Sequence, residues 1–282
     1  MSVPEHPICT FEEITPELAS QYLASNPRNR IVRKPRVAQY ARDMRAGKWR
    51  PDAGETIKFN GTSILDGQHR LLACVKSGTS FWTFVVREVS ISAHHVIDTG
   101  LPRSMADEMR WQGIKDASNS AAILNLLWRV EQNSAIDASN PTRSELVPLL
   151  HETRDLLLTA ASRSRSAWVA TRVPTSSLGV VYMRMDRIGW GNLTDEWFDH
   201  LILGTGYQER DPALLLRNYA MRVKGTTNIR PNQLEWLAIT VKATNLWLTG
   251  QTTRTHLRWR RFGHQAEAFP TLITPGEIHD VV

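Results

Sequence analysis

The stretch Glu55–Gly78, ETIKFNGTSILDGQHRLLACVKSG, decides how the first part of this chain folds. It opens with a β-rich run over Thr56–Phe59 and has a second such run over Thr62–Leu65. Asn60-Gly61 lies between them, and Asn-Gly is the strongest short signal for a hairpin turn. The sequence therefore predicts two antiparallel strands joined by a tight turn.

A helix is expected directly after this hairpin. Asp66-Gly67 interrupts the second strand, and Leu71, Leu72 and Val75 then recur at helical spacing. The five residues DGQHR, here named the Asp66–Arg70 turn, thus lie where a strand ends and a helix begins.

The residue types of the Asp66–Arg70 turn fit phosphate recognition. A helix N-terminus has unpaired N–H groups and the positive end of the dipole. Gly67 allows the backbone to approach a phosphate, while His69 adds a titratable donor and Arg70 a permanent one. The alternative is an ordinary turn in which Asp66 caps the helix and Arg70 pairs with a surface carboxylate.

Three segments resemble the ParB/sulfiredoxin superfamily. The Asp66–Arg70 turn, after a hairpin and before a Leu-Leu-Ala helix, looks like its DGQHR-type signature. Asn26–Arg30 is similar to the NPR segment of ParB-like N-terminal domains, and Val37–Trp49 resembles the helix that follows that segment. The likeness covers about residues 10–112 and is to ParB-like proteins common in bacteriophage genomes.

The resemblance implies a nucleoside triphosphate, ATP or CTP, bound with Mg²⁺. His95–Arg103 falls where partition proteins carry a segment that helps hold nucleotide and metal, which makes Asp98 the candidate metal ligand. Asp66, His69 and Glu55 are the candidate catalytic groups. The candidate phosphate and nucleotide contacts are Gly67, Gln68, His69, Arg70, Arg28, Arg30 and Arg103.

Two departures from the superfamily limit what it implies. Gln68 stands where sulfiredoxins have their catalytic cysteine, so repair of sulfinic acids by that route is excluded. Cys74 follows one helical turn after Arg70 and is expected to be a small buried thiol. No confident helix-turn-helix follows the first domain, so sequence-specific partition activity is not expected.

Composition excludes several classes of protein. With 282 residues, 41% hydrophobic and 22% charged, the chain is typical of one large or two ordinary globular domains. Apolar runs stay far below the eighteen or so residues of a membrane span, and no secretory signal is recognisable, so we expect a cytoplasmic protein without a membrane partner. If a phage encodes it, that is the host cytoplasm. Cys9 and Cys74 lack the spacing of a zinc site or disulfide framework.

The basic charge makes nucleic acid, DNA first, a plausible partner. The formal net charge is +6 and the isoelectric point is near 9.6. Basic residues gather at Arg28–Arg36 and at Arg254–Arg261. The second cluster combines cations with an indole that can stack on bases, and its candidate contacts are Arg254, Arg258, Trp259, Arg260 and Arg261. The alternative is that arginine stems cover the tryptophan on the surface.

The chain is expected to have an α/β (α+β) fold in two domains. Residues 1–112 form a ParB/sulfiredoxin-like domain, whose best further strand is Ser80–Val89, read as buried. Residues 113–282 are expected to form an all-helical domain that binds a nucleic acid or another partner. Within it Arg163–Arg172, RSRSAWVATR, is read as a basic loop. Helices are expected at Ser104–Gln112, Ala117–Glu131, Ser144–Leu158, Ser176–Ile188, Glu196–Leu203, Pro212–Val223 and Pro231–Leu248.

Three classes of function stay open at this point. The leading one is an Mg²⁺-dependent NTP hydrolase or phosphotransferase, or a nucleotide switch without turnover. The second is a DNA-binding or nuclease-like accessory protein that grips backbone phosphate. The third is a non-catalytic interaction protein that retains the fold, and a homodimer is compatible with all three.

Overall fold

The computed structural model describes residues 7–26, 32–90, 104–132, 140–205, 207–225, 231–253 and 256–278. It divides the chain into two compact units. Unit 1 comprises Met1–Arg103 and Ile136–Glu145, and unit 2 comprises Ser104–Ala135 and Leu146–Val282. The fold is mixed α and β, with the strands first and the helices after them, as the sequence predicts at this coarse level.

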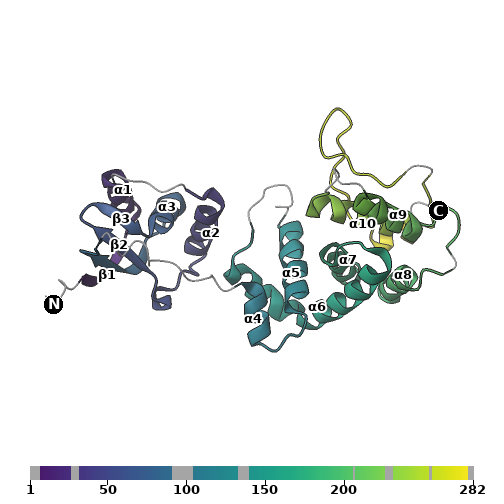
Figure 1. Ribbon diagram of the computed structural model, residues 1–282, viewed down its shortest axis with the longest axis horizontal. Coiled ribbons are helices and arrows are strands. Elements are labelled where there is room, and N and C mark those ends of the chain that lie inside the picture. The colour runs from purple at the N-terminus through teal and green to yellow at the C-terminus, as the bar shows by residue number, and fades with distance from the viewer. Residues whose placement is uncertain are drawn as a thin grey trace. The chain divides into compact units, whose positions relative to one another are not determined.

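Most of unit 1 is drawn in purple and blue in Figure 1. The unit contains a four-stranded sheet in the order β1-β4-β2-β3. The strands are β1 (Ile8–Ile14), β2 (Thr56–Asn60), β3 (Ser63–Asp66) and β4 (Phe81–Arg87). β2 and β3 form the antiparallel hairpin that Asn60-Gly61 predicts, whereas β2 runs parallel to β4. β1 pairs antiparallel with β4 and sets Phe11 opposite Phe84. β1 was not predicted from the sequence.

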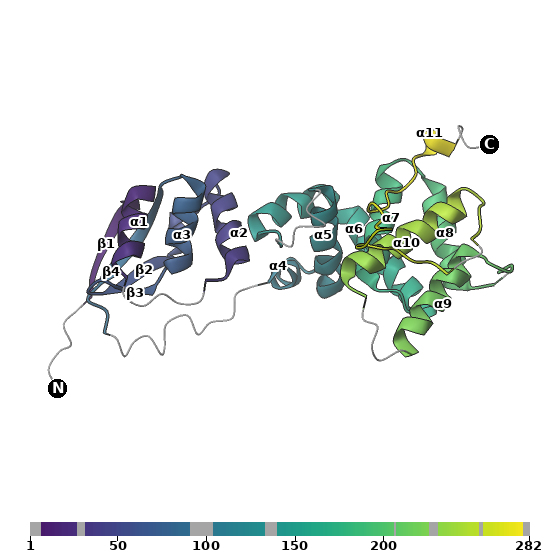
Figure 2. The same cartoon turned by 90° about the horizontal axis from the view of Figure 1, so that it is seen from above.

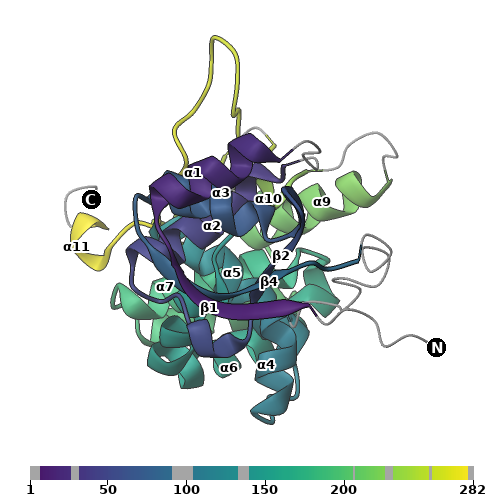
Figure 3. The same cartoon turned by 90° about the vertical axis from the view of Figure 1, so that its left-hand side faces the viewer.

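Three helices cover one face of this sheet (Figures 2 and 3). They are α1 (Pro16–Ser25), α2 (Lys34–Arg45) and α3 (Gln68–Ser77), and a short 3-10 turn occupies Pro51–Ala53. Thr15 caps α1, because its hydroxyl accepts a hydrogen bond from the Leu18 amide at 3.2 Å. Ile57, Phe59, Phe81 and Val85 point from the sheet into the core beneath the helices.

The other face of the sheet carries a group of exposed aromatic side chains. Phe11, Trp82 and Phe84 are 50%, 47% and 37% exposed. The Phe11 ring lies 5.2 Å from that of Trp82 and 5.0 Å from that of Phe84. The expectation that Ser80–Val89 is a buried strand is therefore wrong for one face, because alternate residues of β4 point to opposite sides.

The regular secondary structure of unit 2 is helical at all the residues that the structure describes, as expected, although the segment between α10 and α11 has none. Its helices surround a core that includes Leu127, Val180, Trp197 and Phe198. They are α4 (Met105–Trp111), α5 (Ala117–Glu131), α6 (Arg143–Thr171), α7 (Thr175–Arg187), α8 (Asn192–Leu203), α9 (Pro212–Gly225), α10 (Gln233–Leu248) and α11 (Pro275–Ile278), with the first three residues of α6 assigned to unit 1.

Two expectations about the second half of the chain need correction. The unit boundary lies at Arg103/Ser104 instead of 112/113, because Met105 and Met109 of α4 enter the core of unit 2. Arg163–Arg172 is not a loop, since residues up to Thr171 belong to α6. Ser164, Ala167 and Thr171 are fully buried at helical spacing, so small side chains on one face fix this segment against the core.

None of the helices that the structure describes is both long and apolar enough to cross a bilayer.

Candidate functional site

The Asp66–Arg70 turn lies at the junction of β3 and α3, as the sequence predicts. Gly67 caps α3 with φ 101°, a backbone conformation that residues with a side chain rarely adopt. A Cβ atom at this position would lie 3.0 Å from Cγ1 and 3.2 Å from Cγ2 of Ile57. Glycine is thus required both by the backbone angle and by the close packing of the turn on β2.

Arg70 is the centre of the polar contacts at this turn. Its Nη1 donates to the Thr56 carbonyl at 2.8 Å and lies 3.4 Å from Oδ2 of Asp66, while Nη2 pairs with the Glu55 carboxylate. The side chain is only 12% exposed. Burial disfavours the charged guanidinium and acts to lower the pKa of Arg70. The nearby carboxylates of Asp66 and Glu55 have the larger combined effect, so the pKa of Arg70 is raised. Arg70 is therefore a charged and firmly oriented donor.

The two carboxylates on Arg70 differ in their freedom to move. Asp66 is 16% exposed, accepts from the Gly67 amide at 2.7 Å and lies 3.6 Å from Nζ of Lys58. Glu55 is 53% exposed and lies just before β2. Glu55 can rotate into solvent, whereas Asp66 is held by three neighbours. The Nη2 group of Arg70 can therefore exchange its partner, Glu55, for another anion.

The other two side chains of the turn are less open to a ligand. Nε2 of His69 accepts a hydrogen bond from the Arg33 amide at 3.0 Å, which requires the tautomer with its proton on Nδ1. Gln68 is only 6% exposed. In this conformation His69 joins α3 to the segment before α2, and its Nε2 is not directed at a phosphate.

Several predicted site residues lie outside the described residues. They are Arg28, Arg30, Asp98, Arg103 and Arg254. Within the part that the structure describes, no group of three or more His, Cys, Asp or Glu side chains is arranged to hold a metal ion. Glu55 and Asp66 do converge, but on the guanidinium of Arg70.

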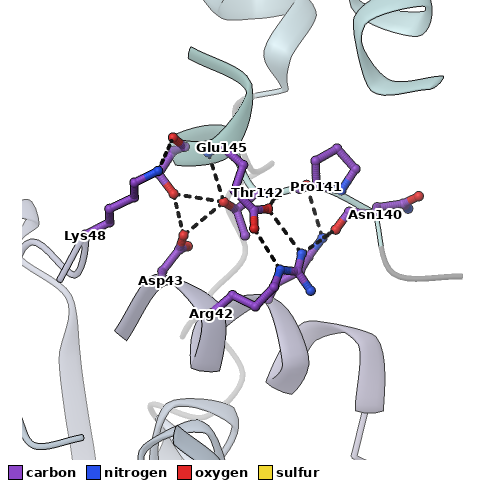
Figure 4. Close-up of polar contacts among 9 residues, drawn as sticks. Arg42, Asp43, Lys48, Asn140, Pro141, Thr142 and Glu145 are labelled. Carbon is purple, nitrogen blue, oxygen red and sulfur yellow. Dashed lines mark hydrogen bonds and ion pairs between the residues drawn. The ribbon is translucent and has the colours of Figure 1, made fainter. Parts of the chain in front are cut away.

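A second polar cluster in unit 1, which the sequence analysis missed, joins α2 to residues 140–145 (Figure 4). Arg42 forms a bidentate pair with Glu145 at 2.8 and 3.2 Å, and also donates to the Asn140 carbonyl at 2.9 Å. Asp43 accepts from the Thr142 hydroxyl at 2.9 Å. Lys48 donates to the Ser144 carbonyl at 3.1 Å. Carbonyls, hydroxyls and carboxylates here all have protein partners, so this is a structural attachment.

One part of this cluster was visible in the sequence. Thr142-Arg143-Ser144-Glu145 has the capping-box pattern of a helix N-terminus. The Thr142 amide donates to Oε2 of Glu145 at 2.6 Å, and the Glu145 amide donates to Oγ1 of Thr142 at 3.2 Å. The pattern predicts the start of α6, although not that α2 would bind it.

The basic cluster near the C-terminus has no regular secondary structure at the residues described. Trp259 is only 8% exposed, and its indole donates to the Ala268 carbonyl at 3.1 Å. Arg258 is exposed, Arg260 and Arg261 are half-buried, and the Arg261 guanidinium lies 5.0 Å from the centre of the Phe262 ring. The Trp259 ring therefore packs in the core, and the exposed aromatic ring of this segment is Phe262, at 78%.

Comparisons of this chain with protein-family models, with curated proteins and with solved structures found no match.

Proposed function

We propose that unit 1 binds a nucleoside triphosphate at the Asp66–Arg70 turn, in the manner of the ParB/sulfiredoxin superfamily that this turn resembles. One observation carries the proposal: the buried, oriented guanidinium of Arg70 is covered on one side by Glu55, a half-exposed carboxylate that can move away. A carboxylate and a phosphate bind an arginine through the same geometry of two oxygens on two N–H groups. Glu55 therefore occupies the place that a phosphate would take.

The residues of the turn would divide the work as follows. Phosphate oxygens replace Glu55 at Nη2 of Arg70, while Thr56 and Asp66 keep Nη1 in place. The N-terminus of α3, which Gly67 opens, adds the positive end of the helix dipole.

Magnesium fits the charge balance of this arrangement. A triphosphate has more negative charge than one arginine and one helix end can offset, and Asp66 and Glu55 add to it. Mg²⁺ prefers carboxylate and phosphate oxygens, so the displaced Glu55 becomes a candidate ligand beside Asp98, the ligand that the resemblance implies.

Calorimetric titration with ATP, CTP and GTP, with and without Mg²⁺, tests the proposal. Arg70→Ala is expected to weaken binding at least tenfold, since a hydrogen bond to a charged group contributes about 1.5–3 kcal/mol. Glu55→Gln is expected to tighten it in the absence of Mg²⁺, because a competing anion is removed. Glu13→Gln is the matched control, because Glu13 is exposed on β1, which β4 separates from β2 and β3. Wild-type protein that binds none of the nucleotides, or Arg70→Ala that binds as wild type does, would reject the proposal.

Turnover is a separate measurement. If the protein hydrolyses or transfers the phosphoryl group, Asp66 is our candidate for the base, and Asp66→Asn should lower the rate more than the affinity. Product analysis with labelled nucleotide and Mg²⁺ separates an enzyme from a switch: no product from wild type that binds nucleotide indicates a switch. A DNA shift without nucleotide that Arg70→Ala abolishes would favour the DNA-accessory function instead.

A further inference from the structure

Unit 2 has two adjoining hollows beside α6. The first has a volume of about 630 Å³ and lies between the loop from α4 to α5, α5 and α6. The second has a volume of about 420 Å³ and lies between α5, α6 and the turn into α7. Arg165 lines both, so the two hollows adjoin at this residue, and together they are here named the α6 groove.

A single face of α6 forms the floor of this groove. Arg154, Leu158 and Arg165 line the first hollow, and Arg165, Trp168 and Arg172 line the second. The spacing of four, seven and three residues from Arg154 to Trp168 keeps these four side chains on one side of the helix. They extend over about 21 Å at 1.5 Å per residue, and Arg172 follows directly after Thr171, the last residue of α6.

The charged side chains that line the groove are mostly positive. Its cations are Lys115, Arg154, Arg165 and Arg172, and the acidic side chain among the lining residues is Asp116. Arg165 is 66% exposed and lies 3.1 Å from Asp116. Arg154 donates to Oε1 of Gln112 at 3.0 Å. An anionic ligand would therefore meet a net positive surface whose arginines are partly oriented in advance.

Two buried polar atoms in the lining are unsatisfied. Ser120 is fully buried, lines the first hollow, and its Oγ has no hydrogen-bond partner among the described residues. Asn119 lines the second hollow, and its Oδ1 is also buried with no partner in the described part of the chain. Leaving such atoms unpaired costs free energy, and both oxygens are shielded from solvent, so they belong to the polar interior beside the groove and are not part of its contact surface.

Trp168 gives the groove a surface for stacking. It is 41% exposed, and the Arg172 guanidinium lies 5.2 Å from the centre of its ring. Unpaired bases stack on aromatic rings and on guanidinium planes, whatever their sequence.

We propose that the α6 groove binds single-stranded nucleic acid, with phosphates at Arg154 and Arg165 and a base stacked on Trp168. Two features favour this occupant. The ring of Trp168 can stack only on a base whose face is open, which the interior of a duplex does not offer. The cations are spread over a length that exceeds one nucleotide.

The test is fluorescence anisotropy of the full chain with a labelled oligodeoxythymidylate of twelve residues, in the absence of nucleotide. Trp168→Ala should weaken binding at least about fivefold, the lower end for loss of one stacked base. Arg165→Gln should weaken it and reduce the slope of log affinity against log salt by about 0.7, the value for one phosphate contact on a single strand. The matched controls are Trp111→Ala, at an 84% exposed indole on α4, and Arg217→Gln, at an exposed arginine on α9. Both should bind within twofold of wild type.

Each contrary result overturns the proposal. These are no binding by wild type at low salt, equal losses in the groove variants and their controls, or equal affinity for a twelve-base-pair duplex. Tight binding of a mononucleotide that Trp168→Ala abolishes would show a small-ligand site instead. Thermal melting of each variant confirms that it is folded. Arg70→Ala should bind the oligonucleotide as wild type does, so failure here and failure of the nucleotide site in unit 1 are distinguishable.

Discussion

Gly67 and Gly61 lie six residues apart and both have positive φ, 101° and 55°, but their surroundings differ. A Cβ atom at Gly67 would meet Ile57 at 3.0 Å, whereas one at Gly61 would meet nothing within 4 Å. Gly61→Ala should therefore cost only the backbone strain, about 1 kcal/mol. Gly67→Ala should cost more, about 2–3 kcal/mol, because strain and overpacking add. Urea unfolding measures both, and equal losses would contradict the packing argument.

The two cysteines should react at very different rates. Cys74 is fully buried in unit 1, and burial, with a smaller effect of Glu17, raises the pKa of its thiol to about 11. The thiolate is the reactive form, so very little of Cys74 is reactive near pH 7.5. Cys9 is exposed. We expect an alkylating reagent to modify one thiol in the native protein and two in urea, and none in native Cys9→Ser. Rapid modification of the folded Cys9→Ser variant would contradict the burial of Cys74.

At this scale the sequence predicted some side chains well and others poorly. Leu71 is fully buried, as its helical spacing indicated, but Val75 of the same pattern is 41% exposed. Ala73 is buried instead, and Cys74 is buried as predicted, since small side chains fit where α3 lies close to α1 and α2. At the candidate functional site, the sequence predicted that Glu55 would lie near the Asp66–Arg70 turn. The sequence could not show that its carboxylate would turn toward Arg70, fifteen residues away.

At the scale of elements, the attachment of residues 140–145 to α2 should depend on Glu145 and on pH. Burial opposes the charge of Glu145, but hydrogen bonds from Arg42 and from the Thr142 amide outweigh it and lower its pKa. A carboxylate with a lowered pKa stabilises the fold above its unfolded-state pKa, about 4.3, and this stabilisation is lost as the pH falls through the folded-state value.

Glu145→Gln should therefore lower the free energy of unfolding by about 1.5–3 kcal/mol at pH 7, because it removes charged hydrogen bonds. The difference from wild type should stay constant down to about pH 5 and shrink below about pH 4, where wild type also loses the charge. Chemical denaturation across this range measures it, with Glu13→Gln as the exposed control. A difference that does not change down to pH 3 would mean that the charge of Glu145 is not what holds the segment.

Two elements, β1 and α6, show why local sequence patterns were not sufficient to predict the secondary structure. β1, with the sequence ICTFEEI, has no clear alternation, because both faces of this edge strand are largely exposed. Its pairing partner, β4, lies some seventy residues later, as the alignment of Phe11 with Phe84 shows. In α6, the arginines and serines of RSRSAWVATR resemble a loop in composition, yet the buried positions of Ser164 and Ala167 fix a helix. Tertiary packing decided both elements.

At the scale of the whole molecule, the change from strands to helices could be predicted, because the period of the hydrophobic pattern changes along the sequence. Which residues belong to each unit could not be fully predicted. Ile136–Glu145 belongs to unit 1 although about thirty residues of unit 2 precede it. Such a discontinuous unit arises from side-chain bonds between distant segments, such as Arg42 with Glu145, which leave no period in the sequence.

The two proposed sites lie in different units and share no residue, which leads to a prediction about the whole chain. The turn uses Glu55, Asp66 and Arg70, and the α6 groove uses Arg165 and Trp168. Substitutions that share no partner residues usually have additive effects. Arg70→Ala should therefore change oligonucleotide affinity less than twofold, Arg165→Gln should change nucleotide affinity less than twofold, and the double variant should lose both.

Binding of one ligand at saturating concentration of the other checks the same point, because coupling between two sites is reciprocal. If nucleotide changes the affinity for the oligonucleotide by more than about fivefold, and the oligonucleotide changes the affinity for nucleotide by the same factor, the sites are linked and independence is wrong. If nucleotide displaces the oligonucleotide completely and Arg70→Ala prevents it from doing so, both ligands use the turn. The α6 groove would then lose its assigned role, while the phosphate site in unit 1 would stand.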